Sequence, residues 1–68
     1  MITTYDSLHT MNDNIYDVIY DSERKAFGVI VAWDDFTCEP QIKYCDSLDN
    51  AKRLAIGFVI AENNIFNF

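Results

Sequence analysis

The chain has 68 residues, half of them hydrophobic, and its eleven acidic and five basic residues give a net charge of −6. A chain of this length forms a single domain, residues 1–68, which buries only about 60% of the surface that it exposes on unfolding. The excess of acids disfavours direct binding to nucleic acid, because that binding depends on Lys and Arg displacing counterions from phosphates. It favours a protein partner with a basic surface. The alternative is that the charge only keeps the domain soluble.

The first residues and the apolar runs of the chain indicate where in the cell the protein is expected. MITTYD has neither a basic start nor an apolar run, which disfavours a secretion signal. The longest non-polar run, residues 54–61, is too short to span a membrane. We therefore expect a cytoplasmic protein with no membrane partner.

The N-terminal segment TTYDSLHTMNDN predicts a short helix. Tyr5, Leu8 and Met11 recur three residues apart, and a threonine before them can cap the first turn. We expect this helix to precede the strands of the domain.

Three segments with strand character follow, namely NIYDVIYD, AFGVIVAW and QIKYCD. SERK predicts a hairpin turn between the first two, and DDFTCEP predicts a loop before the third. The face expected to pack on a helix holds Tyr16, Val18, Tyr20, Phe27, Val29, Val31, Trp33, Ile42 and Tyr44. The opposite, open face holds Ile15, Asp17, Ile19, Asp21, Ala26, Gly28, Ile30, Ala32, Lys43 and Cys45. The reverse assignment stays open, because Ile15 and Ile19 are also typical of a core.

The segment SLDNAKRLAIGFVIAENN predicts a C-terminal helix. Asp46 or Ser47 can cap its start, and Asn63 and Asn64 suit a left-handed exit. The stripe expected to cover the sheet is Leu48, Ala51, Leu54, Ala55 and Phe58. The other side carries Ile56, Val59 and Ile60. The tail IFNF or the N-terminal helix can cover these three residues, and otherwise we expect a homodimer.

The predicted fold is α+β in the order α-β-β-β-α, with a three-stranded antiparallel sheet and the C-terminal helix packed on one face. This order resembles the double-stranded RNA-binding domain, whose first two strands are similar to YDVIYDSERKAFGVIVAW at Tyr16 and Phe27. SLDNAKRLA is similar to the start of that family's second helix. The matching residues are Ser47, Ala51, Lys52 and Ala55. Leu48 and Asp49 replace the paired lysines that grip phosphates, so the resemblance implies the topology without direct nucleic-acid binding.

The residues that carry enzyme chemistry are sparse. His9 is the only histidine, and Cys45 precedes a helix start, where burial is a better explanation than nucleophilicity. Asp34 and Asp35 are adjacent carboxylates without a third ligand, which favours a solvated loop over a metal site. We expect no enzyme activity, no metal and no cofactor, with Cys38 and Cys45 reduced.

Acidic residues are the candidate partner-binding residues. Asp13, Asp17 and Asp21 recur every four residues, which predicts a widely spaced row along a strand. The full candidate set is Asp13, Ile15, Asp17, Ile19, Asp21, Glu23, Asp34, Asp35 and Glu39. This acidic start, MITTYDSLHTMNDNIYD, resembles in general character the stand-alone inhibitors of phages and mobile elements, anti-CRISPR and anti-restriction proteins among them.

That resemblance implies an inhibitor that acts in the cytoplasm of a host cell. It would block a host defence or nucleic-acid-processing protein, with its acidic surface mimicking or competing with nucleic acid. The alternative is a degenerate RNA-binding-like domain that serves as a dimerisation or regulatory subunit.

Overall fold

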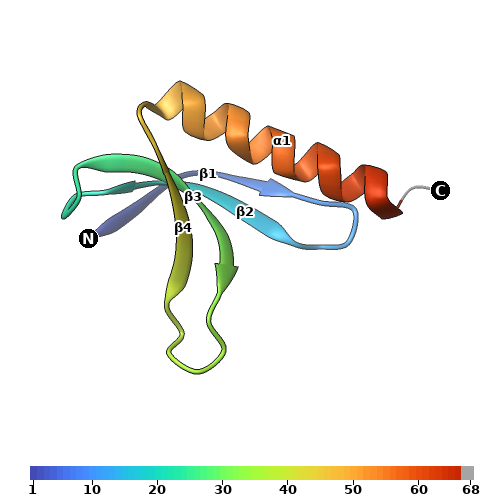
Figure 1. Ribbon diagram of the computed structural model, residues 1–68, viewed down its shortest axis with the longest axis horizontal. Helices are drawn as coiled ribbons and strands as arrows, with labels where there is room; N and C mark the ends of the chain where they lie inside the picture. The colour runs from blue at the N-terminus through green and yellow to red at the C-terminus, as the bar shows by residue number, and fades with distance from the viewer. Residues whose placement is uncertain (67–68) are drawn as a thin grey trace.

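The protein is an antiparallel meander of four strands followed by one long helix in a computed structural model that describes residues 1–66 (Figure 1). The elements are β1 (Ile2–His9), β2 (Ile15–Asp21), β3 (Ala26–Trp33), β4 (Pro40–Cys45) and α1 (Leu48–Phe66). The strands lie in the order β1-β2-β3-β4, and α1 covers one face of the sheet. The α+β class, the antiparallel sheet and the C-terminal helix are confirmed. The order α-β-β-β-α is wrong, because the fold is β-β-β-β-α.

The predicted N-terminal helix is instead an edge strand. β1 pairs with β2 along its whole length, and its pairing shifts register between Thr4 and Asp6. This β-bulge places Tyr5 as an extra residue, so Tyr5 and Leu8 face α1 together although they are three residues apart. The spacing that imitated a helix is therefore the spacing of a bulged strand.

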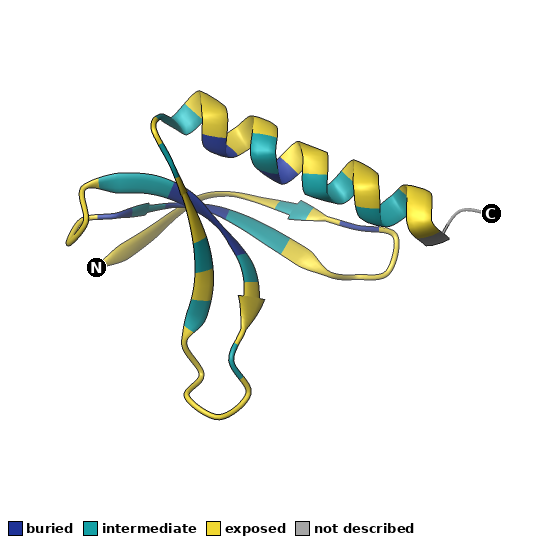
Figure 2. Cartoon of the chain, viewed as in Figure 1, coloured by how far each residue is buried: buried dark blue, intermediate teal, exposed yellow. Residues whose placement is uncertain are grey.

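The main core lies between α1 and the sheet. Val18 and Val29 from the central strands meet Ala51 and Ala55 from the helix, and all four are fully buried (Figure 2). The two alanines keep this side of the helix small, so it can approach the sheet closely. The residues packed around this centre are Leu8, Tyr16, Phe27, Val31, Cys45, Leu48, Leu54 and Phe58. The predicted helical stripe is confirmed.

A second apolar centre lies on the face of the sheet away from α1. Ile19 is fully buried and Ile30 nearly so, although both were expected on an open surface. Gly28, also on this face, makes the close packing possible, since a Cβ atom there would lie 2.8 Å from Ile42 Cγ2 and from the carbonyl oxygen of Lys43. Ile19 therefore belongs to the interior and is a poor candidate for partner contact.

The faces of β4 are the reverse of the prediction. Gly28 pairs with Tyr44 and Ile30 pairs with Ile42, so both β4 side chains point away from α1. Lys43 takes the opposite face, together with Cys45. Trp33 also leaves the predicted core, because the pairing shifts register between Ile30 and Ala32 and the strand runs beyond the helix. A one-residue error of register exchanges every side chain between faces.

The helix begins as predicted and ends later. The backbone N–H of Asn50 donates to Ser47 Oγ at 3.2 Å, which confirms Ser47 as the N-cap. Asn63 and Asn64 do not end the helix, which continues to Phe66. The Asn63 side-chain oxygen accepts the backbone N–H of Met11 at 2.9 Å and so joins the helix to the β1–β2 turn. Ile65 is exposed, and the rest of the tail IFNF lies outside the residues whose side chains are described. α1 is not long and apolar enough to cross a membrane.

Candidate binding surface

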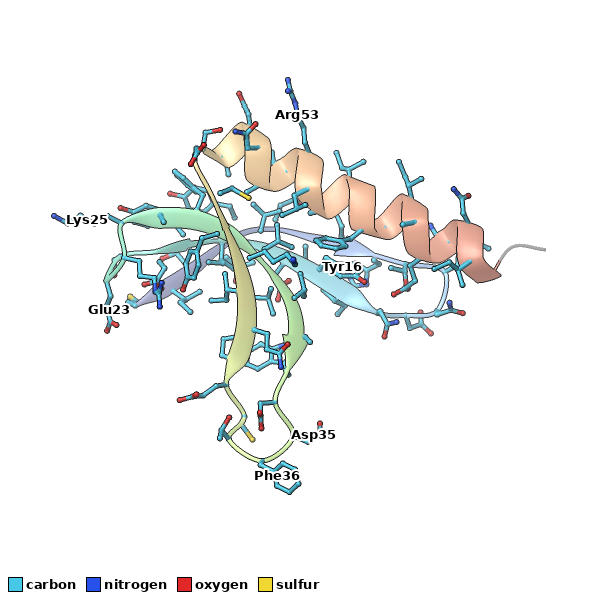
Figure 3. The ribbon with its side chains drawn as sticks, viewed as in Figure 1. Tyr16, Glu23, Lys25, Asp35, Phe36 and Arg53 are labelled. Atoms are coloured by element: carbon cyan, nitrogen blue, oxygen red, sulfur yellow. The ribbon has the colours of Figure 1, made fainter. Side chains whose placement is uncertain are left out.

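The β3–β4 hairpin projects from the body on the side away from α1 (Figure 1). The register shift between Ile30 and Ala32 lies where this hairpin leaves the helix-covered part of the sheet. Such bulges bend and twist a strand, which accounts for the change of direction. Asp35 and Phe36 lie at the tip, remote from the rest of the molecule (Figure 3).

Asp34 shapes the tip from within. Its backbone N–H donates to the carbonyl of Glu39, and its own carbonyl accepts the N–H of Cys38, both at 2.9 Å. Its Oδ1 accepts the backbone N–H groups of Phe36 at 2.8 Å and Thr37 at 3.0 Å. These bonds hold the pKa of the Asp34 carboxyl below its usual value, since they favour the charged form. Asp34 is therefore a structural residue that fixes the turn.

The ordered tip presents apolar side chains to solvent. Phe36 is 98% exposed and Trp33, at the base of the same arm, is 57% exposed. Exposed Asp35 and Glu39 flank them, and residues 33–40 contain no Lys or Arg. Aromatic residues are enriched at the centres of protein interfaces, where their burial supplies much of the affinity. The tip thus combines an exposed aromatic side chain, which can anchor a partner, with negatively charged neighbours.

Two predicted acids of β2 are already engaged within the fold. Asp17 and Asp21 share the face away from α1, as expected. Ser7 Oγ donates to Asp17 Oδ1 at 2.6 Å. Asp21, only 8% exposed, accepts the Tyr44 hydroxyl at 2.9 Å and the backbone N–H of Glu23 at 3.0 Å. The bond from Tyr44 is the main cause that lowers the pKa of Asp21.

The remaining predicted acids lie at separate corners of the molecule. Asp13 occupies the β1–β2 turn in a left-handed conformation, with φ of 63°, near exposed Ile15. Glu23 lies in the β2–β3 turn, at the opposite end of the β1–β2 pair (Figures 1 and 3). Asp34, Asp35 and Glu39 lie together in the β3–β4 hairpin, which thus holds three of the candidate acids.

A further polar cluster joins the end of α1 to the β1–β2 turn. Glu62 Oε1 accepts Asn14 Nδ2 at 3.1 Å and the Tyr16 hydroxyl at 3.2 Å, while its Oε2 is buried without a hydrogen-bond partner of good geometry. The adjacent Thr10 side chain contributes most to a lowered pKa of Glu62. Because Thr10 Oγ1 also accepts the N–H groups of Asn12 and Asn14, this cluster orders the turn.

Other candidate chemistry finds no support in the described geometry. Burial, and secondarily the charge of Asp46, raises the pKa of the Cys45 thiol, which makes it a poorer nucleophile. Within residues 1–66 no three potential ligands gather into a metal-binding group, and this part of the chain has no pocket. His9 is exposed on β1.

Sequence reasoning missed Phe36 and Trp33 as candidate binding residues. The signal for Phe36 was its place within DDFTCEP. The turn-forming residues of this segment predict a loop, in which an aromatic side chain has no neighbouring strand to pack on and is therefore exposed. Comparisons with protein-family models, with curated proteins and with solved structures find no match to this chain. The surface itself is therefore the basis for inferring function.

Proposed function

We propose that this protein is a small non-enzymatic inhibitor that binds a host protein through its β3–β4 hairpin. The observation that carries this proposal is the near-complete exposure of Phe36 on a turn in which Asp34 donates one hydrogen bond and accepts three. Because these bonds fix the turn, its backbone loses little conformational freedom on binding, which favours affinity. Asp35 and Glu39 would meet Lys or Arg at the rim of an apolar pocket.

The charge of the molecule indicates what kind of protein carries that pocket. A net charge of −6 steers the protein toward basic surfaces and speeds the encounter. Basic clefts are typical of proteins that bind nucleic acid. The hairpin would occupy such a cleft and exclude its nucleic-acid ligand, as an anti-CRISPR or anti-restriction protein encoded by a phage or mobile element does. The expected site of action is the host cytoplasm.

The alternative role, a dimerising regulatory subunit, is favoured by a different surface, the exposed Ile56 and Ile60 of α1. The two roles are compatible, because α1 and the hairpin tip lie on opposite sides of the molecule (Figure 1).

Affinity capture with matched variants tests the proposal. The tagged protein, its Phe36→Ala variant and a Met11→Ala control are immobilised and exposed to extract of cells that carry the gene. Met11 is also exposed and apolar, but it lies in the β1–β2 turn. We expect one nucleic-acid-binding protein to be retained by the parent and by Met11→Ala and lost with Phe36→Ala. The captured protein should then lose its nucleic-acid binding when the parent is added. Equal retention by Phe36→Ala would contradict the proposal.

A further inference from the structure

The outer face of α1 carries an apolar stripe of two exposed isoleucines with a glycine beside it. Ile56 is 48% exposed and Ile60 55% exposed, although both lie in the middle of the helix. Gly57 follows Ile56 and lies beside this pair on the helix surface, next to Ile60, because each helical residue turns by about 100°. A Cβ atom at Gly57 would have no atom within 4 Å, so the missing side chain leaves a gap beside the two isoleucines. Arg53, one turn earlier, points away from the sheet (Figure 3). Nothing in the described chain covers this stripe.

We propose that a second copy of this chain covers it, with the two α1 helices antiparallel about a two-fold axis. Side-chain size supports this arrangement. When Ile60 of one copy packs into the gap at Gly57 of the other, symmetry makes the same contact a second time. Each large side chain thus meets a small one, and helices pack by fitting ridges into such grooves.

Charge selects the antiparallel direction. The basic residues of α1, Lys52 and Arg53, lie in its first half, whereas its last turn has no basic residue. The last turn carries the negative end of the helix dipole, which a cation stabilises. In the antiparallel pair Arg53 lies opposite Asn64 of the second copy, so each helix supplies the cation that the other lacks. A parallel pair would set the two Arg53 side chains side by side.

The arrangement also determines where the two binding hairpins lie. Because the tip of the β3–β4 hairpin projects from the side of the molecule away from α1, pairing through α1 turns the two hairpin tips outward, away from each other (Figure 1). The dimer would present two separate copies of Phe36. The pairing itself does not depend on the proposed function of the hairpin and is measured without any target.

Sedimentation equilibrium of the purified protein tests the pairing. We expect a mass of about twice the monomer's 7.9 kDa, falling to the monomer mass in Gly57→Leu and in Ile60→Glu. Gly57→Leu is informative, because in the monomer its new side chain meets empty space and replaces a poor helix former. It should therefore break the dimer while leaving the fold intact. Ile15→Glu, an exposed isoleucine on the sheet, is the control and should leave the dimer unchanged.

A spin label distinguishes the direction of the pair. With Cys38→Ser and Cys45→Ala, a label on Asp49→Cys reports the separation of the two copies of residue 49. In the antiparallel pair these lie about 19 positions apart along the helices, or about 28 Å at 1.5 Å per residue. A separation near the 8–10 Å spacing of parallel helix axes would overturn the proposed geometry. A monomer at all concentrations, or a dimer unaffected by Gly57→Leu, would overturn the interface itself.

Discussion

The Tyr44 hydroxyl donates to Asp21 Oδ2 at 2.9 Å, across the intervening strand β3. The bond is possible because the β3 residues on this face are small: Gly28 pairs with Tyr44, and Ala26 pairs with Asp21. Arg24 lies over the Tyr44 ring, with its guanidinium carbon 4.7 Å from the ring centre. These contacts join β2 to β4 on the face without a helix.

Tyr44→Phe should make stability less dependent on pH at both extremes. The pKa of Asp21 is lowered in the folded state, so its contribution is present above the unfolded value near 3.8 and is lost as the pH falls through the folded value. The pKa of Tyr44 is raised, mainly by burial and then by Asp21, so its contribution is lost as the pH rises above about 10.

Denaturant unfolding of Tyr44→Phe and the parent across the pH range measures this. The parent should be more stable near neutral pH, with a higher denaturant concentration at its unfolding midpoint. The difference should shrink below about pH 4 and again above about pH 10. A difference that is constant with pH would show that the contribution of the Tyr44 hydroxyl does not depend on its bond to ionised Asp21.

Gly28→Ala should destabilise the protein by about 1–3 kcal/mol, the usual cost of overpacking. The added methyl would lie 2.8 Å from the Lys43 carbonyl oxygen, which is backbone and cannot turn aside as a side chain can. Gly57→Ala is the matched control and should stabilise by about 0.5–1 kcal/mol, because it improves an exposed helix position. Both are measured by urea unfolding in the monomeric Ile60→Glu background. Equal effects of the two substitutions would contradict the close packing at Gly28.

Asn63→Ala should loosen the β1–β2 turn from the helix. The substitution removes the acceptor of the Met11 N–H, whose bond of 2.9 Å joins these segments together with the bond from Asn14 to Glu62. A net loss of about 1 kcal/mol corresponds to about fivefold faster local opening. Hydrogen exchange at Met11 should accelerate by about this factor, whereas Asn64→Ala, at an exposed position, should leave it unchanged.

The parts of the fold that the sequence predicted correctly rest on local signals. The Ser47 cap, the helical stripe and the strands at β2 and β3 each follow from neighbouring residues, and each is confirmed. The errors come from bulges and register. The bulge after Thr4 imitated helical spacing, and the pairing of Gly28 with Tyr44 set the faces of β4. Neither is encoded within a single segment.

The same errors limited the prediction of the site. Asp21 could not be recognised as an internal residue while Tyr44 was assigned to the other face of the sheet. The hydrogen bond of Asp17 could not be predicted either, because its donor Ser7 belongs to β1, for which the sequence predicts a helix. The grouping of Asp34, Asp35 and Glu39 was predictable, because they belong to one short loop. The exposure of Phe36 depends on how far the hairpin projects, which only the three-dimensional arrangement gives.

The most direct test of the hairpin as the binding element is to immobilise the parent and its variants and to measure the association and dissociation rates of the captured partner on each. We predict that Phe36→Ala weakens binding at least tenfold, mainly through faster dissociation, because it removes the anchor. The double variant Asp35→Asn, Glu39→Gln should instead slow association and flatten its dependence on salt. Both variants should unfold thermally like the parent, since none of the three side chains accepts or donates a hydrogen bond within the turn. If Phe36→Ala binds the partner as tightly as the parent does, the hairpin is not the binding element.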